Sequence, residues 1–146
     1  MKIAIGADHA GFEYKEEIGA FLREMNIDVQ DCGTHSAERV DYPDYAVAVA
    51  HLVASHDADF GILVCGSGIG VSITANKVEG VRAANCLTGE MAHVARAHNN
   101  ANVLCLGERL VSLFEAKDIV RAFLHAEFEG GRHTVRVEKI HNLTGL

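Results

Sequence analysis

The chain has 146 residues, 49% of them apolar and 23% charged, a length that favours one domain with a full hydrophobic core. Its 13 basic and 20 acidic residues give a net charge of −7, which disfavours nucleic acid and anionic membranes as partners. No segment reaches the roughly 18 continuous apolar residues that cross a bilayer. Asp8 interrupts the first apolar run, which is typical of a strand and not of a signal peptide. We therefore predict a single cytoplasmic domain over residues 1–146.

Apolar runs and helical periodicity alternate along the first half of the chain. Residues 2–7 form a short apolar strand, and residues 12–26 place apolar side chains three, four and seven apart, as a helix does. A weaker strand at 27–30 precedes a loop. Pro43 suits the first turn of the helix that we predict at 44–55.

The second half repeats this alternation. We predict strands at 60–65, 81–86 and 103–107, and helices starting at 71, 89 and 111. The last helix ends near 124, and a tail with a short amphipathic piece follows it.

Five nearly all-apolar strands that alternate with helices predict a parallel sheet covered on both faces. We expect a three-layer α/β/α sandwich of Rossmann-like type, with strand order 2-1-3-4-5 and a C-terminal helical tail. In that order the first and third strands are neighbours. Their carboxyl-end loops would then place Asp8 and His9 beside residues 65–70.

A glycine-rich turn follows the third strand and reads Cys65-Gly66-Ser67-Gly68-Ile69-Gly70. Strand, glycine turn and helix in that order make a backbone cradle for anions. The turn lacks the lysine of a phosphate-binding P-loop and the spacing of a dinucleotide fingerprint. A tight turn that binds nothing, and a cysteine that merely ends a core strand, are the alternatives. The position of Cys65 argues against both alternatives, because its thiol stands at the rim of the cradle, where it could react as a thiolate.

The cysteines and histidines lack metal-ligand spacing. No CxxC occurs among the four cysteines, and two histidine pairs are five residues apart instead of four, so we predict no metal and no disulfide. His98 differs from the other histidines because polar Asn99 follows it at the end of a helix, where it could exchange protons near neutral pH.

Three arginines stand near predicted loops. Arg132 and Arg136 are four apart and would share one face if the tail is helical, and Arg109 follows the fifth strand. Solvated surface arginines are the ordinary interpretation. In a chain of net charge −7, they could instead form a phosphate clamp.

Several of these pieces together resemble one family. The sequence is similar to the ribose-5-phosphate isomerase type B family, which includes galactose-6-phosphate and allose-6-phosphate isomerases. The matching pieces, in chain order, are Gly6–Gly11, Asp41-Tyr42-Pro43, Cys65–Gly70, Ala75-Asn76-Lys77, His98-Asn99, and Glu129-Gly130-Gly131-Arg132-His133 with Arg136.

The resemblance implies a homodimer, or a dimer of dimers, with an active site shared between subunits. It implies that Cys65 is the base that moves a proton between two carbons, and that His98 is an acid that acts across the interface and helps to open the sugar ring. Some relatives use a glutamate at the position of Val71, which cannot take a proton here. The other implied roles are enediolate binding by Gly66, Ser67, Gly68, Ile69 and Gly70; sugar binding by Asp8; phosphate binding by His9, Arg109, Arg132 and Arg136, assisted by Asn99; and pocket lining by Tyr42.

Aldose–ketose exchange proceeds either by a hydride shift, which needs a metal, or by proton transfer, which needs a base and an oxyanion cradle. The sequence supplies the second set, so we predict a cofactor-free isomerase of ribose 5-phosphate and ribulose 5-phosphate in the pentose phosphate pathway. Allose 6-phosphate, galactose 6-phosphate and a tetrose phosphate stay open as substrates. Two other classes also stay open: a non-catalytic flavodoxin-like phosphate-binding module and a thiol redox protein.

Overall fold

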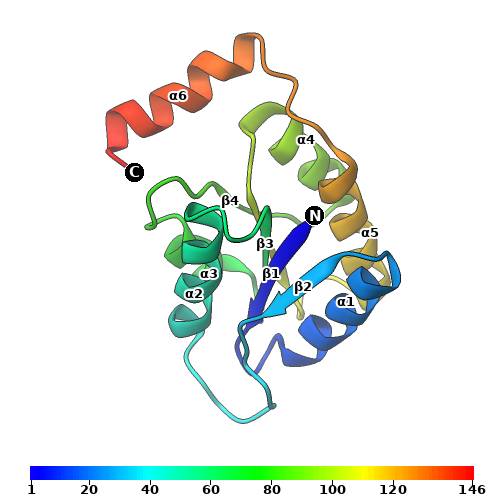
Figure 1. The fold of residues 1–146 in the computed structure, drawn as a ribbon. Helices are drawn as coiled ribbons and strands as arrows, with labels where there is room; N and C mark the ends of the chain where they lie inside the picture. Colours follow the sequence, from blue (N-terminus) through cyan, green and yellow to red (C-terminus); the bar gives the residue numbers. More distant parts are fainter.

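The computed structural model describes all 146 residues as a parallel sheet with helices on both faces (Figure 1). The fold class predicted from the alternation of elements is thereby confirmed. In chain order the elements are β1 (Lys2–Ala7), α1 (Phe12–Glu24), β2 (Asp28–Asp31), α2 (Tyr42–Ala54), β3 (Phe60–Cys65), α3 (Ile69–Ala75), β4 (Ala83–Asn85), α4 (Gly89–Asn99), β5 (Val103–Gly107), α5 (Leu113–His125) and α6 (Arg132–Thr144).

The strand order is β2-β1-β3-β5-β4, so the predicted order 2-1-3-4-5 is wrong for its last two strands. All five residues of β5 are buried, whereas the three residues of β4 are only half-buried. A strand that is apolar on both faces gains most from a central position, because helices cover it on either side. The shorter β4 therefore forms one edge of the sheet, opposite β2.

The edge strand β4 is also covered by a side chain. Asn76 donates a hydrogen bond to the Ala83 carbonyl over 2.9 Å and accepts one from the Ala83 N–H over 2.8 Å. Asn102 accepts from the Arg82 N–H over 2.7 Å. These contacts occupy backbone groups at the start of β4 that would otherwise be open to further pairing. β4 is shorter than the predicted strand at 81–86.

Two apolar layers hold the helices against the sheet. Alternate strand residues point to opposite faces, so Ile62 and Val64 of β3 face α1, α4 and α5, whereas Leu63 and Cys65 face α2 and α3. Phe123 of α5 is fully buried in the first layer. The alternation thus places the sulfur of Cys65 on the α2/α3 side of the sheet, at its carboxyl end.

The helical tail is confirmed as α6, which projects beyond α4 and lies apart from the sheet in Figure 1. It buries only His133 and Val137 and exposes Val135 and Leu143. A helix this exposed contributes little to the core of its own chain. None of the helices is both long and apolar enough to cross a membrane.

Candidate active site

The cradle is built where β3 ends and α3 begins. Cys65 is 5% exposed, and the backbone N–H of Gly68 donates a hydrogen bond to its Sγ over 3.1 Å. Gly68 has φ +76°, and a Cβ there would lie 2.3 Å from Asn85 Oδ1. Only glycine fits this backbone and this space. The turn therefore wraps around the sulfur of Cys65.

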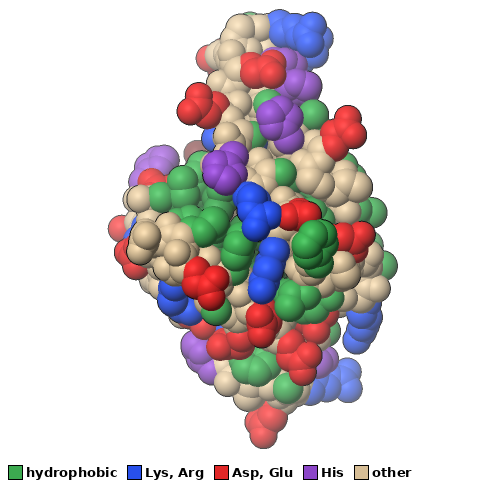
Figure 2. All heavy atoms as spheres, turned by 90° about the vertical axis from the view of Figure 1, so that its right-hand side faces the viewer, with side chains coloured by type: hydrophobic (Ala, Val, Ile, Leu, Met, Phe, Trp, Pro, Cys, Tyr) green, Lys and Arg blue, Asp and Glu red, His purple; other side chains and the backbone are tan.

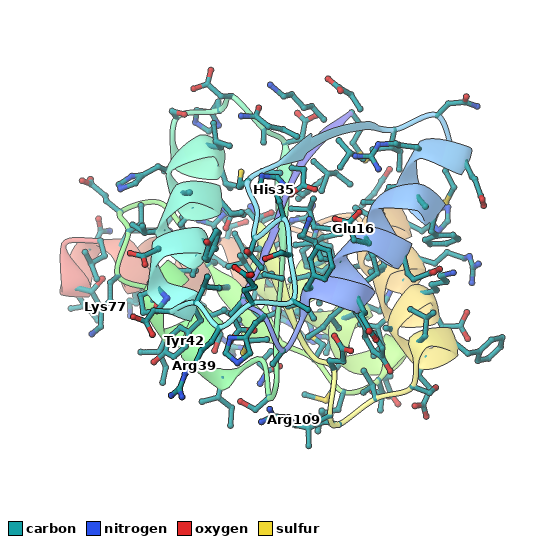
Figure 3. The ribbon with its side chains drawn as sticks, turned by 90° about the horizontal axis from the view of Figure 1, so that it is seen from below. Glu16, His35, Arg39, Tyr42, Lys77 and Arg109 are labelled. Atoms are coloured by element: carbon teal, nitrogen blue, oxygen red, sulfur yellow. The ribbon has the colours of Figure 1, made fainter.

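Two further glycines allow side chains to approach the turn closely. A Cβ on Gly70 would lie 2.6 Å from the ring of Tyr42, and one on Gly66 would lie 3.0 Å from the guanidinium of Arg109. Figure 3 labels Tyr42, in the first turn of α2, and Arg109, in the loop after β5. The missing side chains thus make room for an aromatic ring and a cation at the cradle.

These groups line one pocket of about 340 Å³ at the carboxyl edge of the sheet. β1 and β5 both pair with β3, so their carboxyl-end loops meet there, as the sequence predicted for β1. Arg109 is the only lysine or arginine in its lining. The lining residues are Asp8, His9, Ala10, Tyr42, Cys65, Gly66, Ser67, Gly70, Arg109 and Leu110.

Asp8 and His9 are held by their own loops. Asp8 is 7% exposed, and its Oδ1 accepts hydrogen bonds from the backbone N–H groups of Ala10 and Gly11 over 3.0 and 3.1 Å. His9 Nδ1 lies 3.2 Å from the N and 3.1 Å from the O of Val40. Both side chains therefore keep one polar atom, Oδ2 of Asp8 and Nε2 of His9, for a ligand.

The loop after β5 is bonded to the glycine turn. The Glu108 N–H donates to the Cys65 carbonyl over 2.9 Å, and the Arg109 N–H donates to the Gly66 carbonyl over 3.0 Å. Partial burial raises the pKa of the Glu108 carboxyl, whose Oε2 accepts a weak hydrogen bond of 3.4 Å from the Tyr14 N–H of α1. Glu108 thus faces α1, and Arg109 is left as the cation of the pocket.

Asn85 is a site residue that sequence reasoning missed. Its Nδ2 donates to the Ser67 carbonyl over 3.1 Å, and its buried Oδ1 has no hydrogen-bond partner. It reaches the turn from β4, two strands away from β3. No local pattern around residue 85 indicates this contact.

The remaining predicted site residues lie outside this pocket. Gly68 and Ile69 belong to the turn, and the side chain of Ile69 is exposed. Asn99 lines a different pocket of about 400 Å³ between β4, α4 and α6. His98 stands at the end of α4, and Arg132 and Arg136 stand one turn apart at the start of α6. A single chain therefore does not bring His98, Asn99, Arg132 or Arg136 to Cys65.

The fold and the pocket define a doubly wound α/β protein with a glycine-rich turn, a thiol and an arginine at the switch point of its sheet. The chain belongs to the ribose/galactose isomerase family, whose model matches residues 3–140. This match confirms the family resemblance found in the motifs.

Individual relatives agree with the family match. Ribose-5-phosphate isomerase B of Escherichia coli (strain K12) is 53% identical over 139 residues, which are 95% of this chain and 93% of that protein. The solved structure of Clostridium thermocellum ribose-5-phosphate isomerase B has a TM-score of 0.98 at 52% identity and covers 99% of this chain and 98% of that one. The Mycoplasma genitalium enzyme, solved with bound ribulose-5-phosphate, has a TM-score of 0.94 at 44% identity, with coverage of 99% and 96%.

Proposed function

We propose that this chain is an aldose–ketose isomerase that interconverts ribose 5-phosphate and ribulose 5-phosphate. The observation that carries the proposal is the sulfur of Cys65, which lines the pocket and accepts a hydrogen bond from the glycine turn. The relatives named ribose-5-phosphate isomerase B support the same substrate.

The chemistry proposed for this pocket is proton transfer through an enediolate. The thiolate of Cys65 removes the proton from C2 of the open-chain aldose, and the electron pair forms the C1–C2 double bond while O1 becomes an oxyanion. Transfer of the proton from O2 to O1, and return of the first proton to C1, gives the ketose. Backbone N–H groups of the turn would stabilise the oxyanion, an effect typically worth about 3 kcal/mol of barrier per donor.

We assign the other pocket residues by their charge and reach. Arg109 and His9 would bind the phosphate, because a guanidinium and an imidazole N–H suit phosphate oxygens. Oδ2 of Asp8 would accept a hydrogen bond from a sugar hydroxyl, and the ring of Tyr42 would close one wall of the pocket. We further propose the cytoplasm as the location, because a phosphate ester is charged and does not cross membranes unaided.

A homodimer would complete the site. His98, the proposed acid, lies outside the pocket of its own chain, and α6 exposes apolar side chains as it projects from the body. We propose that a second copy supplies His98, Asn99, Arg132 and Arg136 to the pocket around Cys65. Two arginines on one face of α6 would then add a second phosphate grip.

The test uses purified protein and a panel of four-, five- and six-carbon aldose phosphates, with ketose formation followed by NMR. We expect the highest kcat/KM with ribose 5-phosphate, and loss of turnover in Cys65→Ala. The matched control is Cys32→Ala, which removes a half-buried thiol outside the pocket and should leave turnover unchanged. A six-carbon or four-carbon substrate that is turned over faster would replace the substrate assignment. Normal activity in Cys65→Ala would remove the mechanism.

A further inference from the structure

Three ionisable side chains meet at the C-terminal end of α4, outside the pocket. The ring of His98 stacks on that of His133, with centroids 4.4 Å apart and an interplanar angle of 8°. Glu129 Oε2 lies 3.8 Å from His98 Nε2 and 3.6 Å from His133 Nε2. Figure 2 shows several histidine side chains in the part of the molecule near α6. The group joins the end of α4 to the segment that leads into α6.

The backbone holds this group in register. The Glu129 N–H donates to the Ala97 carbonyl over 3.0 Å, which ties the segment to α4 one residue before His98. The His133 N–H donates to the Gly130 carbonyl over 3.0 Å at the start of α6. His98 and His133 therefore face each other because of main-chain contacts and not only because of their rings.

The two histidines differ in their surroundings. The side chain of His98 is 39% exposed, whereas that of His133 is 8% exposed and its buried Nε2 has no hydrogen-bond partner. Burial lowers the pKa of His133, and the charges of His98, Arg132 and Arg136 act in the same direction, against that of Glu129. His133 is therefore the buried, fixed member of the pair, and His98 is the one that a ligand can reach.

The geometry favours proton sharing over metal binding. Two imidazoles bind one ion well when their lone pairs converge on it. Here the two rings are stacked and nearly parallel, so the lone pairs of each imidazole lie in the plane of its own ring. An ion in the plane of one ring would lie outside the plane of the other ring. A carboxylate oxygen that lies 3.8 Å from one Nε2 and 3.6 Å from the other interacts with both rings by charge and needs no such convergence.

We propose that Glu129 and His133 are positioning residues for His98. The ring of His133 fixes the plane of His98, and the Glu129 carboxylate, 3.8 Å from Nε2 of His98, favours a proton on that nitrogen. Nδ1–H is then left to be donated to the substrate. No hydrogen bond within the chain engages that Nδ1. The proposal rests on the proposed function, in which His98 opens the sugar ring.

The ring-opening step balances as follows. Doubly protonated His98 gives its Nδ1 proton to the furanose oxygen as the bond from that oxygen to C1 breaks, and the bonding electrons stay on the oxygen. The anomeric hydroxyl loses its proton to water and becomes the C1 carbonyl. His98 is left neutral, with its remaining proton on Nε2 towards Glu129, and is recharged by a proton from water.

The first test variant is Glu129→Gln, with Glu127→Gln as the control on the same segment, where Glu127 is exposed and makes no ion pair. ¹⁵N NMR of the neutral His98 ring reports its tautomer, and kcat against pH reports its protonation during turnover. We expect one tautomer, with the proton on Nε2, in the unmodified protein and in Glu127→Gln. In Glu129→Gln we expect a mixture of tautomers, an altered pH profile, and kcat reduced about tenfold or more with KM within twofold.

His133 is tested by two substitutions. His133→Phe keeps a flat ring under His98 and should retain at least half of kcat, whereas His133→Ala should lose about tenfold. If His133→Ala does not fold, Glu129→Gln alone decides. An unchanged tautomer and pH profile in Glu129→Gln overturns the proposal. Absence of isomerase activity in the unmodified protein would instead overturn the proposed function, while the tautomer measurement still judges the positioning of His98.

Discussion

The backbone N–H of Gly68 points at the sulfur of Cys65, 3.1 Å away. An N–H that donates to sulfur stabilises negative charge there, which is the form in which a thiol acts as a base. The contact exists because Gly68 takes φ +76°, a conformation that L side chains rarely adopt. The geometry of a single glycine therefore connects the fold to the proposed chemistry.

The four cysteines should react with alkylating reagents at very different rates. Burial raises the pKa of Cys86 to about 11 and raises that of Cys105 well above its ordinary value, so both remain thiols at neutral pH. Cys65 lines the pocket. Iodoacetamide reacts with the thiolate form of cysteine. At roughly neutral pH we expect it to label Cys65 well before Cys86 and Cys105, as followed by peptide mass spectrometry. Equal labelling of Cys86 and Cys65 would contradict this arrangement.

Gly70→Ala should lower activity through Tyr42. The new Cβ would lie 2.6 Å from the ring of Tyr42, which must then move out of the pocket wall. We expect kcat/KM with ribose 5-phosphate to fall about 10- to 100-fold, or roughly 1.4 to 2.8 kcal/mol of barrier. The control is Gly89→Ala, where the nearest atom would be at an ordinary 3.4 Å.

A double mutant separates the clash from other effects of the methyl group. In Tyr42→Ala the ring is absent, so adding Gly70→Ala should cost little more. A penalty for Gly70→Ala that is the same with and without the tyrosine would show that the two residues are not coupled.

Arg109→Ala should mainly weaken substrate binding. Arg109 is the only arginine or lysine in the pocket lining, and a hydrogen bond to a charged group is worth about 1.5–3 kcal/mol. We expect KM to rise about tenfold or more and kcat to change less, because the phosphate is held equally before and during the reaction. The control Arg121→Ala removes an exposed arginine paired with Asp118. A change confined to kcat would place Arg109 at the reacting carbons instead.

Asp31→Asn should destabilise the fold at neutral pH. Lys15 is fully buried, with its Nζ 2.6 Å from Asp31 and 2.7 Å from Glu16, so removing one carboxylate leaves a buried charge poorly compensated. We expect a loss of about 3 kcal/mol in the free energy of unfolding, measured by urea denaturation. Glu16→Gln, which alters the more exposed partner, should cost less.

The effect of Asp31 should depend on pH. Burial raises its pKa, but the hydrogen bonds from Lys15 and from the Gly33 N–H outweigh burial, so the pKa lies below its ordinary value. A carboxyl with a lowered folded-state pKa contributes stability above its unfolded pKa and loses it as the pH falls through the folded value. The stability gap between the unmodified protein and Asp31→Asn should therefore narrow below about pH 4. A gap that stays constant down to pH 2 (well below the ordinary pKa of Asp, about 3.9) would contradict the pairing.

The sequence predicted much of the fold and most of the residues that line the pocket around Cys65. Alternating apolar strands and helices are local patterns, and they indicated the parallel sheet. The same reasoning placed Asp8 and His9 beside Cys65, because adjacent parallel strands end at the same edge. The predicted order of β4 and β5 was wrong, because chain order does not state which strand becomes the edge of the sheet. The apolarity of residues 103–107 was a sequence signal for a central strand.

By itself, the sequence determined the chemistry available at the turn after β3: a thiol, glycines that expose backbone N–H groups, and no metal-ligand spacing in that stretch. Only the tertiary structure decided that Asn85 holds the Ser67 carbonyl, that His98 stacks on His133, and that His98 lies away from Cys65 within one chain. The physical reason is distance along the chain. Periodicity and turn propensity report interactions among residues a few positions apart, whereas contacts across 18 or 35 positions depend on how whole elements pack.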